Sequence, residues 1–218
     1  MFVSVRRYEG IDPADFGAIN AIIHDGFLPV LRESPGFLLY ALGNCEPDVV
    51  LVLNVFHSEP EMLGSNEQAA HFVGESLAQF MPNPPQITAG TAYALALPRQ
   101  DGGLEVNDEA QPLFFSFRRY TGFNALDTPM ITRLVVEDLI PVFIESPGFR
   151  LYVTLNAMDR VLGSLTIFTT REAMHASTES AADFVAAELA PLLPQAPVVT
   201  EGRLGVFWQA PGISQDPV

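Results

Sequence analysis

The pentapeptide Glu33-Ser34-Pro35-Gly36-Phe37 recurs unchanged as Glu145-Ser146-Pro147-Gly148-Phe149, 112 positions further along the chain. In both places a stretch with helical spacing of apolar residues precedes it and an apolar run follows it. Proline and glycine in succession end helices and form turns, so this pentapeptide indicates a helix that turns directly into a strand. Two such junctions at a long spacing indicate that one module occurs twice.

The repeat extends from the pentapeptide in both directions without a gap. The Ser4–Tyr8 segment, SVRRY, matches the Ser116–Tyr120 segment, SFRRY, and the offset is again 112. The same offset relates Gly90 to Gly202, and about a third of the compared positions are identical. An internal duplication explains this agreement, with residues 4–95 and 116–207 as the two copies.

The composition of the connecting stretch sets the predicted domain boundaries. Residues 98–112 are polar, contain two adjacent glycines and lack periodic apolar positions, which is typical of a linker. We therefore predict a first module at residues 1–97, the linker at 98–112, a second module at 113–209 and a loose tail at 210–218.

Each module is predicted to run strand, helix, strand, strand, helix, strand. Asp12 followed by Pro13 is a typical helix start, because an aspartate caps the free amides and proline suits the first turn. Pro29, matched by Pro141, is expected to disrupt that helix near its end. The second helix of the first module is predicted to begin at Ser65.

This order is that of a ferredoxin-like unit, in which both helices cover one face of a four-stranded antiparallel sheet. The other face needs a partner, and the second copy supplies one at high effective concentration. The predicted fold class is therefore α+β, with two ferredoxin-like modules packed sheet to sheet as an intrachain pseudo-dimeric barrel. Further assembly of whole chains stays open.

Several short segments resemble the antibiotic-biosynthesis-monooxygenase-like family of dimeric α+β barrels. They are the first-strand RRY, the ESPGF junction followed by Tyr40, the strand ending at Phe56, and the SNEQAAHFV helix at residues 65–73. The resemblance covers both modules and implies the barrel fold. It implies no single reaction, because the superfamily includes quinone-forming oxygenases, haem degraders and isomerases.

Composition excludes several partners. The formal net charge is −15, which would repel nucleic-acid phosphates and anionic membrane surfaces. Cys45 is the single cysteine, so no intrachain disulfide or thiolate zinc cluster can form. The N-terminus reads as a strand, and no apolar run is long enough to span a membrane. A reduced, cytoplasmic location without nucleic-acid or membrane partners is expected.

Alternate strand positions sort the predicted sheet into an apolar face and a mixed polar and aromatic face. A mixed lining suits a small planar, partly anionic organic ligand, because rings supply contact area and a guanidinium can hold an enolate or phenolate. The alternative is a satisfied interior, with Arg6 paired to an acid such as Glu33 and the tyrosines bonded across the pseudo-dimer. The ligand-pocket candidates are Arg6, Tyr8, Tyr40, Asn54 and Phe56 in the first copy, and Arg118, Tyr120, Arg150, Tyr152, Thr166 and Phe168 in the second.

The four histidines argue against a metal or haem cofactor. His71 matches the position of the haem ligand in haem-degrading relatives, but helical spacing places it on the solvent side and the second copy has Asp183 there. The other histidines are likewise unrepeated, which does not suit a duplicated metal site. No cofactor and no metal site are predicted, and the sequence leaves the catalytic residues unassigned.

Three function classes remain open: a cofactor-independent monooxygenase or related enzyme acting on an aromatic or enolisable substrate, a non-catalytic binder of small hydrophobic ligands, and a structural or stress-associated barrel. The two copies differ along the mixed face, where Leu38 becomes Arg150 and Asn54 becomes Thr166. We therefore expect one half to bind the ligand, and an anionic group to prefer the second copy through Arg118 and Arg150.

Overall fold

The computed structural model describes residues 1–98, 105–106, 112–157 and 160–213, and the chain folds into two compact α+β units. The first unit comprises Met1–Gly90, Gly202–Ile213 and the short strand β6 (Glu105–Val106). The second comprises residues 91–98 and Leu113–Glu201. The unit boundaries therefore differ from the repeat boundaries, because the final segment of each repeat belongs to the other unit. Most of the predicted linker and the end of the predicted tail lie outside the described residues.

Antiparallel strands form the sheet of the first unit. Its strands are β1 (Phe2–Glu9), β2 (Phe37–Cys45), β3 (Val49–Phe56), β4 (Gln86–Thr91) and the C-terminal part of β10 (Val198–Gln209). β3 lies between β2 and β1, with Tyr40 opposite Asn54 and Arg6 opposite Val52. The outer edge of β2 pairs with β10, where Trp208 lies opposite Tyr40 and its ring stacks on Phe37 at 4.8 Å.

The first helical stretch contains the predicted start and the predicted disruption. Asp12 caps the 3-10 turn η1 (Pro13–Asp15), its carboxylate accepting from the amide of Ala14 at 2.9 Å. Beyond it lie α1 (Phe16–Ile22), the π-helical turn η2 (Ile23–Phe27) and α2 (Leu28–Arg32). Pro29 has no amide hydrogen to donate into the ladder, and the disturbance takes the form of this π turn just before it.

The second helical stretch begins earlier than the sequence predicts. It consists of α3 (Glu59–Phe72) and the π turn η3 (Val73–Leu77). Ser58 caps it in a reciprocal capping box with Glu61, a signal that satisfies two free amides at once. The prediction of Ser65 as the N-cap is therefore wrong; Ser65 lies inside α3, buried, and accepts a hydrogen bond from Asn54 at 3.1 Å.

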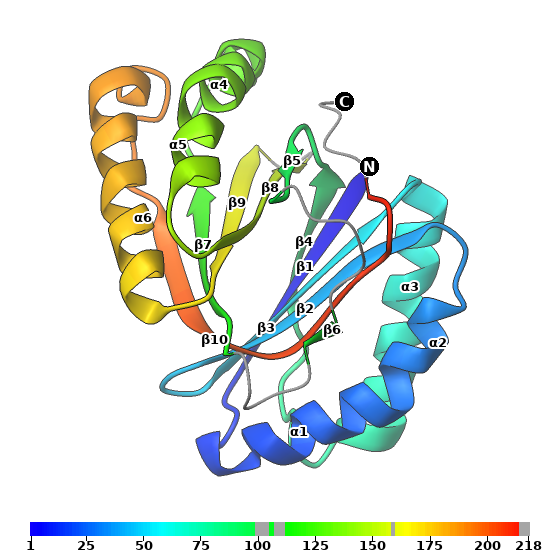
Figure 1. The fold of residues 1–218 in the computed structure, drawn as a ribbon. Helices are drawn as coiled ribbons and strands as arrows, with labels where there is room; N and C mark the ends of the chain where they lie inside the picture. Colours follow the sequence, from blue (N-terminus) through cyan, green and yellow to red (C-terminus); the bar gives the residue numbers. More distant parts are fainter. Residues whose placement is uncertain (99–104, 107–111, 158–159, 214–218) are drawn as a thin grey trace. The chain divides into compact units, whose positions relative to one another are not determined.

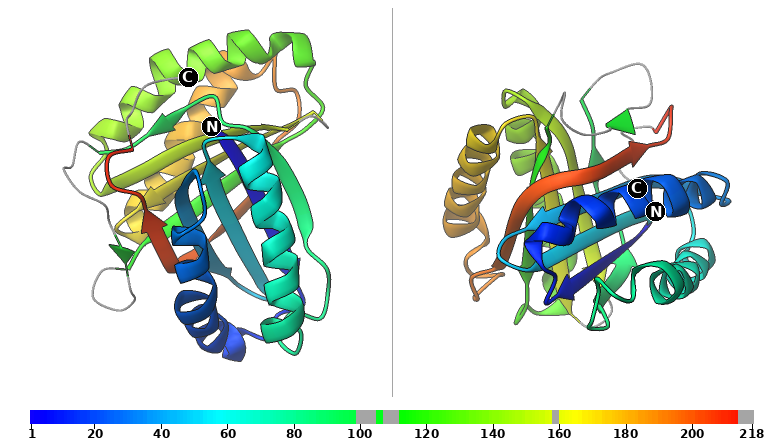
Figure 2. Two further views of the ribbon diagram at one scale, coloured as in Figure 1. Left: turned by 90° about the vertical axis from the view of Figure 1, so that its right-hand side faces the viewer. Right: turned by 90° about the horizontal axis from the view of Figure 1, so that it is seen from below.

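The second unit repeats this order, and each of its main elements starts 112 positions after its counterpart. Its helices lie together on one side of its strands (Figures 1 and 2). The elements are β7 (Phe114–Tyr120), η5 (Ala125–Asp127), α4 (Thr128–Leu134), η6 (Val135–Leu139), α5 (Ile140–Glu145), β8 (Phe149–Ala157), β9 (Val161–Phe168), α6 (Arg171–Phe184), η7 (Val185–Leu189) and the N-terminal part of β10. The short strand β5 (Leu95–Ala96) pairs with β8.

The mixed polar and aromatic face of each sheet packs against the helices of the same unit. In the first unit Tyr8, Tyr40 and Val52 share one core with Ile23 and Phe27 of the π turn. In the second unit Tyr120 and Tyr152 share a core with Val135, Leu139 and Phe143. Any pocket on this face therefore lies between a sheet and its own helices. Within the described residues, no helix is long and apolar enough to cross a membrane.

Candidate functional site

In the first unit, Arg6 is hydrogen-bonded to neutral side chains. Arg6 is buried and donates to Asn66 Oδ1 at 2.9 Å and to Asn54 Oδ1 at 3.0 Å. Asn66 is on α3, so the partners come from the same unit, and the predicted pairing with an acid such as Glu33 is wrong. Ser4 also donates to Asn66 at 2.9 Å, which completes a closed hydrogen-bond network.

The space beside Arg6 is nearly filled. The cavity bounded by Arg6, Tyr8 and Tyr40 has a volume of about 10 Å³, enough for one water molecule at most. Two aromatic rings on its helical side, Phe27 and Phe72, stack at 5.0 Å. The first unit thus brings three candidate residues together but leaves no room for an organic ligand.

The second unit holds the matching arginine with fewer bonds. Arg118 is 3% exposed and donates to Thr178 Oγ1 at 2.8 Å, with a longer contact of 3.4 Å to Thr166 Oγ1. Its Nε atom is buried and has no hydrogen-bond partner among the described residues. Burial lowers the pKa of the Arg118 guanidinium, because desolvation disfavours the charged form. A buried cation with an unused donor is suited to an anionic or carbonyl oxygen.

Two cavities meet at Arg118. The inner one is small, about 30 Å³, and reaches Tyr93, Tyr152 and Ser164. The outer one has a volume of about 300 Å³, at the lower end of the range for small-molecule sites. Arg118, Tyr120, Val185 and Leu193 line both. We call the two cavities together the Arg118 chamber.

The outer part of this chamber is lined mainly by small aliphatic side chains, which would contact an apolar ligand body. The described residues there are Arg118, Tyr120, Thr178, Ala182, Val185, Ala186, Ala190, Leu193, Gln195, Ala196, Pro197 and Val199. Its polar side chains are those of Arg118, Tyr120, Thr178 and Gln195, and Arg118 and Thr178 are hydrogen-bonded to each other. The chamber therefore favours an amphipathic molecule with one polar oxygen directed at the guanidinium.

Smaller side chains line the inner cavity of the second unit. Leu139 stands where the first unit has Phe27, and Ser164 stands where it has Val52. The inner cavity has a volume of about 30 Å³ in the second unit and about 10 Å³ in the first, which agrees with the expectation that the two linings differ.

Three tyrosines line the inner cavity. Burial is the main cause that raises the pKa of Tyr93, Tyr120 and Tyr152, so each phenol stays protonated at neutral pH. These groups can donate or accept hydrogen bonds at a ligand, but they are poor general bases.

Tyr93 was not predicted from the sequence; it lines the inner cavity and lies outside the predicted strand pattern. Thr154 Oγ1 accepts from the amides of Tyr93 at 3.3 Å and Ala94 at 2.9 Å, and this clamp fixes the backbone beside β5. The matching residues of the first unit are Gly205 and Leu42, which cannot form the clamp or supply a ring. Comparing the two copies at this position would have shown the difference.

The remaining candidates lie outside the chamber. Thr166 Oγ1 accepts the long contact from Arg118 and also donates to the carbonyl of Ser116 at 3.4 Å. Phe56 and Phe168 are fully buried and pack on Phe37 and Phe149 as structural core. Arg150 is not among the chamber residues, because a bulge between Phe149 and Leu151 shifts the strand register. The expectation that Arg118 and Arg150 together hold an anionic ligand group is therefore wrong for Arg150, because only Arg118 lines the chamber.

The histidines do not form a metal site. Among the described residues, no group of three or more histidine, cysteine, aspartate or glutamate side chains could hold a metal ion. The side chain of His71 is 75% exposed and lies 3.3 Å from Glu75, one helical turn on. That position agrees with the predicted solvent side of the helix.

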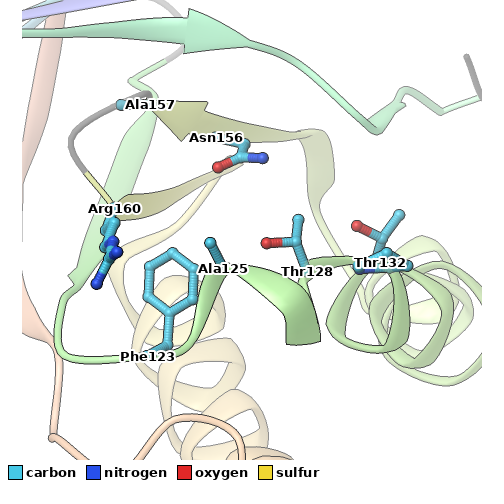
Figure 3. Close-up of a pocket in the computed structure, with 8 residues that line it drawn as sticks. Phe123, Ala125, Thr128, Thr132, Asn156, Ala157 and Arg160 are labelled. Carbon is cyan, nitrogen blue, oxygen red and sulfur yellow. The ribbon is translucent and has the colours of Figure 1, made fainter.

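A second, more open cavity of about 640 Å³ lies elsewhere on the second unit (Figure 3). Asn156 at the end of β8 faces Thr128 and Thr132 on α4, with Phe123 and Arg160 at one end. Its polar side chains are partly or fully exposed and can be satisfied by water. The Arg118 chamber is the stronger candidate, because it holds a buried cation.

Comparisons with known proteins find similar folds but do not identify a reaction. No protein-family model and no curated protein matches the sequence. A provisionally named monooxygenase from Fusobacterium nucleatum is 7% identical, with a TM-score of 0.74 over 97% of this chain and 95% of its own. A second protein with that provisional name, from Lactobacillus acidophilus, is 10% identical, with a TM-score of 0.73 over 99% of both chains.

A third solved structure, of an anthrone oxidase-like protein, is 10% identical and has a TM-score of 0.61 over 100% of this chain and 95% of its own. At these identities the likeness concerns the fold. It agrees with the α+β fold class expected from the sequence.

Proposed function

We propose that the second unit binds a small aromatic or enolisable molecule in the Arg118 chamber and oxidises it with molecular oxygen, without a bound cofactor. The observation that carries the proposal is the buried guanidinium of Arg118, which lines both cavities and whose Nε lacks a described partner. The fold shared with two provisionally named monooxygenases and an anthrone oxidase-like protein agrees with this chemistry.

The residues of the chamber suit the electron-rich form of such a substrate. When an acidic C–H or O–H loses its proton, Arg118 can pair with the resulting enolate or phenolate, an interaction that is strong where water is excluded. The substrate then supplies all the electrons. A CH₂ group and one O₂ give a C=O group and one water, so one oxygen atom enters the product and the other leaves as water.

The finer architecture also belongs to this proposal. The element starts that recur every 112 positions support an origin by tandem duplication. We propose that the two copies close into the sheet-to-sheet pseudo-dimeric barrel, that the second copy alone kept the ligand site, and that the protein works in the reduced cytoplasm without nucleic-acid or membrane partners. The acidic charge and the single, buried Cys45 agree with that setting.

A specific observation favours a second candidate, a non-catalytic binder of small hydrophobic ligands. No carboxylate or imidazole is among the described residues that line the Arg118 chamber, and its tyrosines have raised pKa values. A binder needs no base. A barrel without any pocket is disfavoured by the outer cavity of about 300 Å³.

Anthrone, an enolisable tricyclic ketone, tests the proposal. Metal-free protein is mixed with anthrone, and oxygen consumption is followed together with formation of the quinone. We expect turnover by the wild type and its loss in Arg118→Leu. The matched control is Arg160→Leu, which removes the exposed arginine of the other cavity. Binding without oxygen consumption would support the binder, and a loss in Arg160→Leu alone would move the site to the second cavity.

A further inference from the structure

A chain of three side chains leads from Arg118 to the protein surface. Thr178 Oγ1 accepts from Arg118 at 2.8 Å and lies 3.0 Å from Glu201 Oε1, to which it can donate. The other carboxylate oxygen of Glu201 lies 3.4 Å from Nδ1 of His175. The side chains of His175 and Glu201 are 50% and 27% exposed, so solvent reaches the far end.

Helix and strand geometry explain the alignment. His175 and Thr178 are three residues apart on α6 and therefore share one face of the helix. Glu201 is on β10, in the segment that belongs to the second unit. In the first unit the matching residues are Leu63, Asn66 and Ala89, which contain no titratable group. The combination of His175, Thr178 and Glu201 thus occurs in the second unit, which contains the Arg118 chamber, and not at the matching positions of the first.

We propose that Thr178, Glu201 and His175 form the proton path of the chamber, with Thr178 as the catalytic residue that touches the substrate and the other two acting through it. The substrate O–H or C–H bond breaks and its proton moves to Thr178 Oγ1. The hydroxyl proton of Thr178 moves at the same time to Glu201 Oε1. The electron pair stays on the substrate, next to Arg118.

The hydroxyl of Thr178 has the capacity for this exchange. One of its lone pairs accepts from Arg118, and the second is free for the substrate proton. Its single hydrogen has two alternative acceptors, Glu201 and the carbonyl of Met174 at 3.1 Å. Proton transfer between positioned groups requires distances of about 2.6–3.2 Å, which the contact of 3.0 Å between Thr178 and Glu201 meets.

The charged and titratable groups around the path are Arg118 on β7, Glu201 on β10, His175 on α6, and the phenols of Tyr120 and Tyr152, which interact electrostatically with Arg118. Among these, Glu201 is the group that lies within hydrogen-bond distance of the Thr178 hydroxyl as an acceptor, at 3.0 Å, and His175 lies 3.4 Å from its other carboxylate oxygen. The path rests on the proposed function, since it serves only a substrate that loses a proton in the chamber.

2-Naphthol is the probe, because its absorbance reports ionisation and the free molecule is neutral at neutral pH. Titration calorimetry in buffers of different ionisation enthalpy counts the protons released as it binds. We expect the wild type to bind it as naphtholate and to keep the proton. In Glu201→Gln the protein cannot keep it, so each bound naphtholate should release one proton to the buffer. Thr178→Val should likewise release the proton to the buffer, because the hydroxyl that links the substrate to Glu201 is gone, and Thr178→Ser should restore proton retention.

A purely electrostatic role of Glu201 gives a different result. Its removal would then favour the bound anion without changing where the proton goes. Proton retention in Glu201→Gln equal to that of the wild type overturns the path while leaving the chamber intact. A wild type that does not bind the probe, or binds it equally well as Arg118→Leu, overturns the proposed function and the path together.

Discussion

Arg6 should contribute to the free energy of unfolding but not to ligand binding, whereas Arg118 should contribute to ligand binding and little to the free energy of unfolding. In Arg6→Leu, the buried Asn54 Oδ1 loses its described donor, and Asn66 Oδ1 keeps only the bond from Ser4. An orphaned buried acceptor costs about 1–3 kcal/mol and a lost hydrogen bond about 1 kcal/mol, so the free energy of unfolding should fall by about 2–4 kcal/mol. This loss should appear without any effect on ligand binding by the second unit.

Arg118→Leu removes one good bond, to Thr178, and one long contact, to Thr166. It also removes a desolvated charge with an unused Nε, a change that is close to neutral when a leucine fills the space. The free energy of unfolding should therefore stay within about 1 kcal/mol of the wild type. Urea denaturation followed by circular dichroism compares the two variants. Equal losses of stability would refute this account of the two sites.

Three further outcomes follow from local contacts. Ser58→Ala breaks the capping box of α3 and should lower the free energy of unfolding by about 1 kcal/mol, whereas Ser180→Ala, at an exposed helical position, should change it little in the same urea titration. In Gly205→Ala the new Cβ would meet the carboxamide of Asn20, so the melting temperature should fall and then recover in the double variant with Asn20→Ala. Burial raises the pKa of the Cys45 thiol to about 12 in the folded protein, whereas the thiol of the unfolded chain has a pKa near 8.5 and ionises first. The free energy of unfolding should therefore decline as the pH rises from about 8.5 toward 12, and Cys45→Ala should reduce that slope.

The sequence predicted the elements well because the repeat supplied two readings of each one. Pro29 and Pro141 occupy the same place, and both precede the end of a helix that contains a π turn. Ser65 was a wrong N-cap prediction, because Ser58 with Glu61 forms a capping box that the apolar spacing does not show. The boundaries of the units could not be predicted, because the pairing of β10 with β2 and of β5 with β8 depends on long-range contacts.

The candidate site was predicted in part. Strand parity brought Arg118, Tyr120 and Tyr152 to one face correctly, and their comparison with the first copy indicated that the two halves differ. Parity failed at Arg150, because a bulge next to it reverses the register. Tyr93 lies on an irregular segment, and Glu201 acts through Thr178 across the unit, so no periodic pattern marked either of them.

Titration calorimetry of the wild type and of Arg118→Leu with 2-naphthol tests most directly whether the Arg118 chamber is the ligand site of this protein. The cavity beside Arg6, about 10 Å³, cannot admit the probe, whereas the outer cavity beside Arg118, about 300 Å³, can. We therefore expect one binding site per wild-type chain, and at least tenfold weaker binding by Arg118→Leu, about 1.4 kcal/mol. Two equivalent sites in the wild type, or unchanged binding by the variant, would contradict the assignment.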